Sequence, residues 1–217
     1  MNKRRLLPGR SPDARSGGFT ILELMIATMV FSVVLLLVST GILQIARVYY
    51  KGVTEANTQN TARNIIDTIS QAIQFSGGEV IGTAGSPAPS TDYAFCVGSQ
   101  QFTYRLGWQV ESAGGNPADN QIRHVLVQRS AADCTPQDLA SGSVDGRDLM
   151  NEHMRLSNLV VSNIGPNLYK VEVRVLYGDN DLLNNPTGPD ATCKSERAGT
   201  QFCATAQLST IVVKRVE

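Results

Sequence analysis

Glu23 is the residue whose chemistry most needs an explanation in this sequence. It lies near the start of a long apolar segment, five residues after Gly18 and four after Phe19. A carboxylate inside an apolar membrane helix costs about 2.5–3.5 kcal/mol on insertion scales. The acid therefore either reaches the lipid headgroups or is neutralised by a cation close to it.

Few other residues suggest catalysis. His124 lies in an apolar strand pattern and His153 in a polar stretch, and we interpret both as structural or surface residues. The sequence has no nucleophile elbow, phosphate-binding loop or metalloprotease helix motif. We therefore expect a protein that is not an enzyme and that has no cofactor and no metal.

Two small groups of residues suggest alternatives in which the protein binds a ligand. The segment Asp179-Asn180-Asp181, with Asp190, could supply oxygen ligands to calcium, but its incomplete ligand spacing favours a turn after a strand. A nucleic-acid contact is only a minor alternative, because no basic stripe with interleaved aromatic residues is present. Its candidate residues are Arg105, Trp108 and Arg123.

The apolar segment has the length of a membrane span. From Leu24 to Ile45 no residue is charged, and as a helix this run is about 33 Å long, enough to cross a hydrocarbon core of about 30 Å. The preceding leader is basic, which predicts a cytoplasmic N-terminus and a C-terminal part outside. Its charged residues are Lys3, Arg4, Arg5, Arg10 and Arg15, with one acid, Asp13.

The segment Ser16-Gly17-Gly18-Phe19-Thr20-Ile21-Leu22-Glu23-Leu24 resembles the prepilins of the type IV pilus and type II secretion superfamily. The resemblance covers about Gly17 to Arg47 by motif, and only the architecture beyond that. It implies cleavage after Gly18 by a prepilin peptidase and N-methylation of the new terminal residue, Phe19. It also implies that Glu23 acts in filament assembly, paired with the amine of Phe19 or of a neighbouring subunit.

The rest of the chain predicts one β-rich domain behind a helix. Between Ala62 and Phe75 apolar residues recur at helical spacing, and Ser76-Gly77-Gly78 ends this amphipathic helix. The clearest strands are Leu156–Ile164 and Leu168–Tyr177, joined by Gly165-Pro166-Asn167. Further strand candidates are Tyr93–Val97, Gln101–Trp108, His124–Ser130 and Ala204–Val216.

The predicted fold class is therefore α+β and pilin-like, a long N-terminal helix packed on an antiparallel β-sheet. The predicted organisation has four parts. These are a cleaved leader (1–18), a transmembrane assembly helix (19–46), its amphipathic continuation (47–76) and an extracytoplasmic domain (77–217).

Four cysteines fall in the part predicted to lie outside, where an even count favours two disulfides. Of the three possible pairings we favour Cys193–Cys203, because it is the most local, which leaves Cys96–Cys134. A zinc site is the alternative, but no cysteine spacing resembles a zinc motif. The Cys193–Cys203 loop resembles the disulfide-bounded C-terminal region of many pilins.

Within the family we favour a minor pilin of a type IV pilus, serving pilus biogenesis and adhesion, motility or DNA uptake. Thr40 stands where many major pilins have a proline, and a long loop runs from Gly178 to Phe202. Both features also resemble a J-type pseudopilin of a type II secretion system, which is the first alternative. The implied partners are the prepilin peptidase and methyltransferase, other pilin subunits, the assembly platform and membrane lipid, with final location in a surface pilus. The alternative of another class is a membrane-anchored adhesin that never polymerises.

Overall fold

The computed structural model describes residues 18–82, 91–113, 115–141, 143–195 and 199–215. The chain divides into two compact units, residues 1–45 and 46–217, and the long helix α1 (Ile21–Phe75) belongs to both. In the first unit all the described residues are exposed, including the apolar ones.

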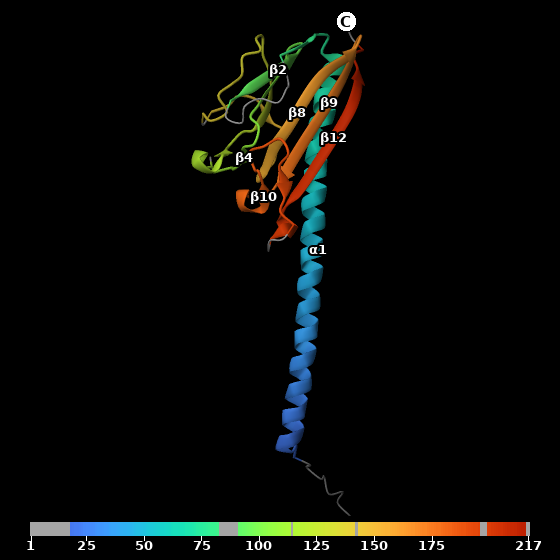
Figure 1. The fold of residues 1–217 in the computed structure, drawn as a ribbon, viewed down its shortest axis with the longest axis vertical. Coiled ribbons are helices and arrows are strands. Elements are labelled where there is room, and N and C mark those ends of the chain that lie inside the picture. Colours follow the sequence, from blue (N-terminus) through green and yellow to red (C-terminus); the bar gives the residue numbers. More distant parts are fainter. Residues whose placement is uncertain (1–17, 83–90, 114, 142, 196–198, 216–217) are drawn as a thin grey trace, which may run out of the picture. The chain divides into compact units, whose positions relative to one another are not determined.

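The second unit combines the C-terminal half of α1 with two five-stranded sheets (Figure 1). One sheet has the order β1-β2-β3-β6-β7 and the other the order β12-β9-β8-β4-β5. The strands of the first sheet are β1 (Val80–Ile81), β2 (Tyr93–Val97), β3 (Gln100–Tyr104), β6 (Leu126–Ser130) and β7 (Arg147–Asp148). Those of the second are β4 (Gln109–Val110), β5 (Gln121–Ile122), β8 (Met154–Gly165), β9 (Leu168–Tyr177) and β12 (Ala204–Val213).

Smaller elements complete the second unit. Strands β10 (Leu183–Asn184) and β11 (Thr192–Cys193) form a separate antiparallel pair, and three short 3-10 helices lie in the loops. The 3-10 helices are Pro117–Asp119, Asn180–Leu182 and Thr200–Phe202. The predicted α+β class, with one long helix followed by a β-rich domain, is confirmed.

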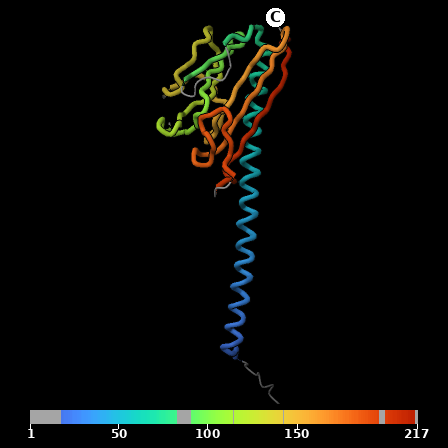
Figure 2. Tube along the Cα trace, viewed as in Figure 1, coloured from blue at the N-terminus to red at the C-terminus, as the bar shows by residue number. Residues whose placement is uncertain are grey.

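The longest strands, β8, β9 and β12, lie side by side in both views of the chain (Figures 1 and 2). Every neighbouring pair among them is antiparallel. The predicted turn joins β8 to β9, and its residue Asn167 has the left-handed φ of 58° that asparagine tolerates. Along β9 the residues alternate between buried and partly exposed, which is the period of a strand with one covered face.

The amphipathic half of α1 packs into the main core. All five predicted apolar face residues are buried in the same cluster as residues of both sheets. They are Ala62, Ile65, Ile66, Ile69 and Ile73. The helix ends at Phe75, and Gly77 follows with a φ of 68°, as expected for a left-handed glycine after a helix.

One predicted strand, Gln101–Trp108, is wrong in its extent. Strand β3 ends at Tyr104 and β4 begins only at Gln109, so the chain passes from one sheet to the other between them. Gly107 makes this crossing possible because it has a φ of 75° and an added Cβ would lie 2.7 Å from the carbonyl oxygen of Thr187. The alternation of apolar residues did not reveal the break.

The helix face gives a direct test of the packing. Ile69 is completely buried, so we expect Ile69→Ala to lower the free energy of unfolding by about 2–5 kcal/mol through lost burial and a residual cavity. The measurement is urea unfolding of the detergent-solubilised full-length chain. Arg63→Ala, on the exposed side of the same helix, should change the stability by less than about 0.5 kcal/mol. Equal effects of the two substitutions would contradict the packing.

Candidate functional site: the start of the long helix

The residues predicted for processing lie immediately before α1. Gly18, Phe19 and Thr20 precede the helix, which begins at Ile21. All three are exposed, and 86% of the surface of Phe19 is accessible. A peptide bond after Gly18 is therefore accessible from outside the folded chain. The predicted leader, apart from Gly18, lies outside the described residues.

Gly18 has no role in the fold that would require glycine. An added Cβ at this position would meet no atom of the described chain within 4 Å. Packing within the described chain therefore does not require a glycine at this position. Cleavage after Gly18 stays a prediction from the sequence.

Thr20 and Glu23 form a reciprocal capping box at the N-terminus of α1. The backbone N–H of Thr20 donates to Glu23 Oε2 at 2.9 Å, and the backbone N–H of Glu23 donates to Thr20 Oγ1 at 3.2 Å. The Thr20 hydroxyl also donates to Glu23 Oε2, at 2.9 Å. This arrangement satisfies two backbone donors that a helix start otherwise leaves without partners.

The capping box changes the interpretation of Glu23. Its carboxylate has a local structural partner as well as the predicted amine, and both capping bonds to it end on the same oxygen. The sequence reasoning missed Thr20, although the signal was present. A threonine followed three residues later by a glutamate, just before an apolar run, is the sequence signature of this motif.

The first half of helix α1 has an apolar surface that no other described part of the chain covers. Between Ile21 and Ile45 every residue is exposed. Among the described residues, α1 is the one helix whose length and apolar composition are sufficient to cross a membrane. Such a surface must meet lipid or other protein chains, because water is an unfavourable neighbour for so much apolar area. The apolar helix is consistent with membrane anchoring.

The residues of the calcium alternative do not converge on one site. Asp179 lies near His153 and Glu111, Asp190 pairs with Arg174 at 3.8 Å, and neither Asp181 nor Asp190 joins the ligand group around Asp179 in the described chain. A calcium site in this loop is therefore not supported. His124 bonds through Nδ1 to Asp148 at 2.8 Å, which fits the structural role expected for it.

Two of the three residues considered for nucleic-acid binding, Arg105 and Trp108, are buried and cannot contact a ligand from solvent. Arg105 is only 7% exposed and forms a bidentate pair with Asp92 at 2.6 and 2.7 Å. Its guanidinium also lies over the ring of Trp108, 4.9 Å from the ring centroid, and Trp108 is itself buried. These side chains hold the loop between β3 and β4 instead of facing a ligand.

The four cysteines form two disulfides, Cys96–Cys134 and Cys193–Cys203, which are the pairings favoured from the sequence. The first joins β2 to the segment after β6. The second joins β11 to the residue before β12, so it closes the end of the long loop. Two disulfides fit a domain that is folded in an oxidising compartment.

The N-terminal segment is also the part of the chain that matches a known family. The model of the family described as the prokaryotic N-terminal methylation motif matches residues 13–39. The match contains Gly18, Phe19 and Glu23, and it supports the type IV pilin and pseudopilin superfamily that the sequence resemblance indicated. The motif points to a structural subunit that is processed by a prepilin peptidase. Neither the comparison with curated proteins nor that with solved structures finds a match.

Proposed function

We propose that this chain is a minor pilin, a low-abundance subunit of a type IV pilus. The prepilin peptidase cuts it after Gly18 and the new amine of Phe19 is methylated. The mature chain stays in the cytoplasmic membrane through residues 19–46, with residues 77–217 outside, until the assembly platform moves it into a surface filament. Residues 47–76 continue the helix into the external domain.

The observation that carries the proposal is the methylation motif at residues 13–39 together with the exposed apolar helix surface from Ile21 to Ile45. A helix of this kind can exchange lipid contacts for contacts with neighbouring helices, where packing and not burial from water drives association. The disulfides support an external location for the domain.

Thr40 supports a minor subunit over a major one. Helix α1 is continuous across this position, and the Thr40 hydroxyl donates to the carbonyl oxygen of Leu37 at 2.9 Å. The proline of many major pilins would remove a helix hydrogen bond and bend the segment. The unbroken helix here therefore differs from the pattern of major subunits.

Processing gives the first test of the proposal. We expect mass spectrometry of the native protein to find a chain that begins at N-methylated Phe19 and co-purifies with filaments. Gly18→Val should leave residues 1–18 attached and remove the chain from filaments, because the β-branched side chain changes the backbone and shape at the cut. The matched control is Gly52→Val, at another open glycine position, which should be cut normally.

Several outcomes would redirect the proposal. Recovery of the wild-type chain with its leader intact, from cells with active peptidase, would contradict filament assembly and favour a membrane-anchored adhesin. If deletion of the gene stops protein secretion and leaves surface pili unchanged, the chain is a J-type pseudopilin. Loss of pili with normal secretion supports the minor pilin.

A further inference from the structure

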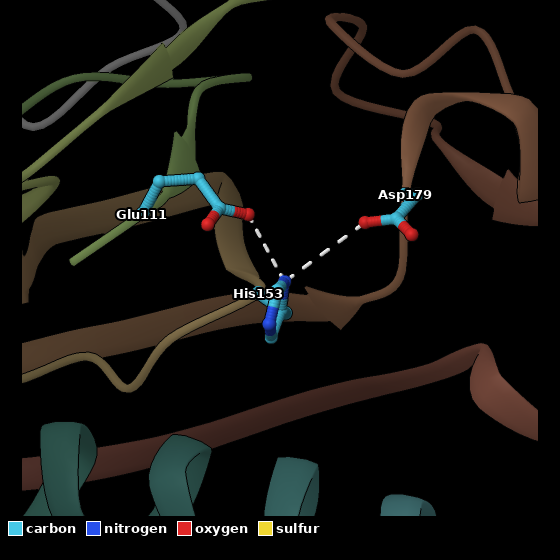
Figure 3. A group of neighbouring side chains, drawn as sticks. All are labelled: Glu111, His153 and Asp179. Atoms are coloured by element: carbon cyan, nitrogen blue, oxygen red, sulfur yellow. Dashed lines mark ion pairs between the residues drawn. The ribbon is translucent and has the colours of Figure 1, made fainter. Parts of the chain in front are cut away.

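Three side chains far apart in sequence meet at one end of the second sheet. Glu111 follows β4, His153 precedes β8 and Asp179 follows β9 (Figure 3). The topology explains the meeting, because β8 and β9 are antiparallel and Gln109 of β4 pairs with Arg155 of β8. The end of β9, the start of β8 and the end of β4 therefore lie together.

The imidazole of His153 lies between the two carboxylates. Its Nδ1 atom is 3.0 Å from Glu111 Oε1 and 3.9 Å from Asp179 Oδ1, and the three ligand atoms lie within 4.8 Å of one another (Figure 3). Ligands bonded to tetrahedral zinc at about 2.0–2.1 Å are about 3.3–3.4 Å apart. The two separations from His153 Nδ1 lie on either side of that value, and the carboxylate oxygens of Glu111 and Asp179, within 4.8 Å of each other, would also move closer around a bound ion.

Buried side chains behind the cluster hold Asp179 in place. Gln109 donates from Nε2 to Asp179 Oδ1 at 2.9 Å, and Arg155 donates to Gln109 Oε1 at 3.0 Å. Both Gln109 and Arg155 are completely buried. Outer hydrogen bonds of this kind orient the ligands of protein metal sites.

The backbone of His153 is also fixed. Its N–H donates to the carbonyl oxygen of Val110 at 2.9 Å, and its own carbonyl accepts from the N–H of Gly178 at 3.1 Å. These two bonds attach the histidine to the residues that precede Glu111 and Asp179. The three candidate ligands are thus connected through short rigid segments, and not through a mobile loop.

Two of the three candidate ligands, His153 and Asp179, line a pocket of about 240 Å³ that opens to solvent, and Glu111 lies next to His153 outside its lining. The carboxylates of Glu111 and Asp179, with oxygens 3.0 and 3.9 Å from His153 Nδ1, give the site a negative charge. A cation can therefore enter this site from outside, and its charge would be offset by two carboxylates.

We propose that Glu111, His153 and Asp179 bind a divalent transition-metal ion of the zinc class. Imidazole nitrogen with carboxylate oxygens suits zinc, cobalt or nickel, whereas calcium prefers six to eight oxygen ligands. Three protein ligands leave one position of a tetrahedral ion for water. The bound ion joins the ends of β4 and β9 to the start of β8, which stabilises the external domain.

The test uses the full-length chain in detergent, treated with a chelator and then titrated with zinc chloride in a calorimeter. We expect saturable binding of one ion per chain and an increase in the melting temperature. Cobalt chloride should bind at the same site and give the visible absorption of tetrahedral cobalt. Calcium chloride should neither bind there nor compete. A wild-type chain without saturable zinc binding would overturn the proposal and leave His153 as an ordinary ion-pair residue.

Variants locate the site. His153→Asn should abolish the zinc binding while keeping a residue that tolerates the φ of 61° at this position. Asp179→Asn should weaken binding at least tenfold, with an oxygen still able to accept from Gln109. The matched control is His124→Ala, which removes a histidine paired with one carboxylate and should bind zinc like the wild type. Unchanged zinc affinity in both His153→Asn and Asp179→Asn would place the ion elsewhere and refute the assignment.

Discussion

Arg155→Ala should lower the free energy of unfolding by about 3–5 kcal/mol. Arg155 is the largest of the completely buried side chains in the described chain. Its removal leaves a cavity and also leaves buried acceptors without their donor. The measurement is the urea unfolding midpoint of the detergent-solubilised full-length protein.

The acceptors explain the size of the effect. The guanidinium donates to Gln109 Oε1 at 3.0 Å and to the carbonyl oxygens of Pro186 and Gly178 at 3.2 and 3.3 Å. All these partners are neutral, and burial lowers the pKa of Arg155 to about 10, a value at which the side chain is still charged at neutral pH. Arg155 thus links the loop after β9, through Gly178 and Pro186, to Gln109 of β4 in the second sheet.

Two comparisons separate the contributions of volume and hydrogen bonding. Arg155→Met fills much of the cavity without restoring the donors, so we expect it to recover only part of the loss. Arg123→Ala, at an exposed arginine, should change stability by less than about 0.5 kcal/mol. If Arg155→Met is as stable as the wild type, the buried hydrogen bonds add nothing to net stability and the explanation is wrong.

Glu23→Gln should abolish incorporation into filaments as completely as Glu23→Ala. Glutamine keeps a capping box with Thr20, since the motif accepts either residue, but it removes the negative charge. If Glu23 acts through an ion pair with the amine of Phe19 or of a neighbour, the charge is the essential property. The measurement is the amount of each variant in purified filaments, relative to its amount in membranes.

Thr20→Ala is the matched control for the capping box. It removes the hydroxyl that bonds to Glu23 and keeps the carboxylate, so it should weaken the first helical turn by about 0.5–2 kcal/mol and still assemble. Normal assembly of Glu23→Gln, together with failure of Thr20→Ala, would show that Glu23 acts through the helix start and not through its charge. Cleavage at Gly18 should be largely unchanged in all three variants.

Sequence periodicity predicted the parts of this fold in which one face of a long element is buried. The face from Ala62 to Ile73 and the alternation in β9 each extend over several periods, so their patterns are clear. The stop at Gly77 and the turn before Leu168 depend on glycine and asparagine, whose backbone preferences are visible in a sequence.

The sequence could not predict features that depend on contacts between distant residues. Strands of two residues, such as β4 and β5, are too short to show a period. The crossing at Gly107 is determined by the backbone of Thr187, 80 positions further along the chain. For the same reason Glu111 and His153 did not stand out, because only the pairing of β4, β8 and β9 brings them to Asp179.

Strand β12 covers one edge of β9, so β9 is protected only when the chain is complete through β12. Its ten residues pair with β9 along their whole length, and β9 has β8 on its other side. During synthesis β9 emerges before β12, so for that interval it presents an open edge able to pair with any neighbouring chain. A chain that stops before residue 204 therefore carries an aggregation-prone edge on β9, which only pairing with β12 covers.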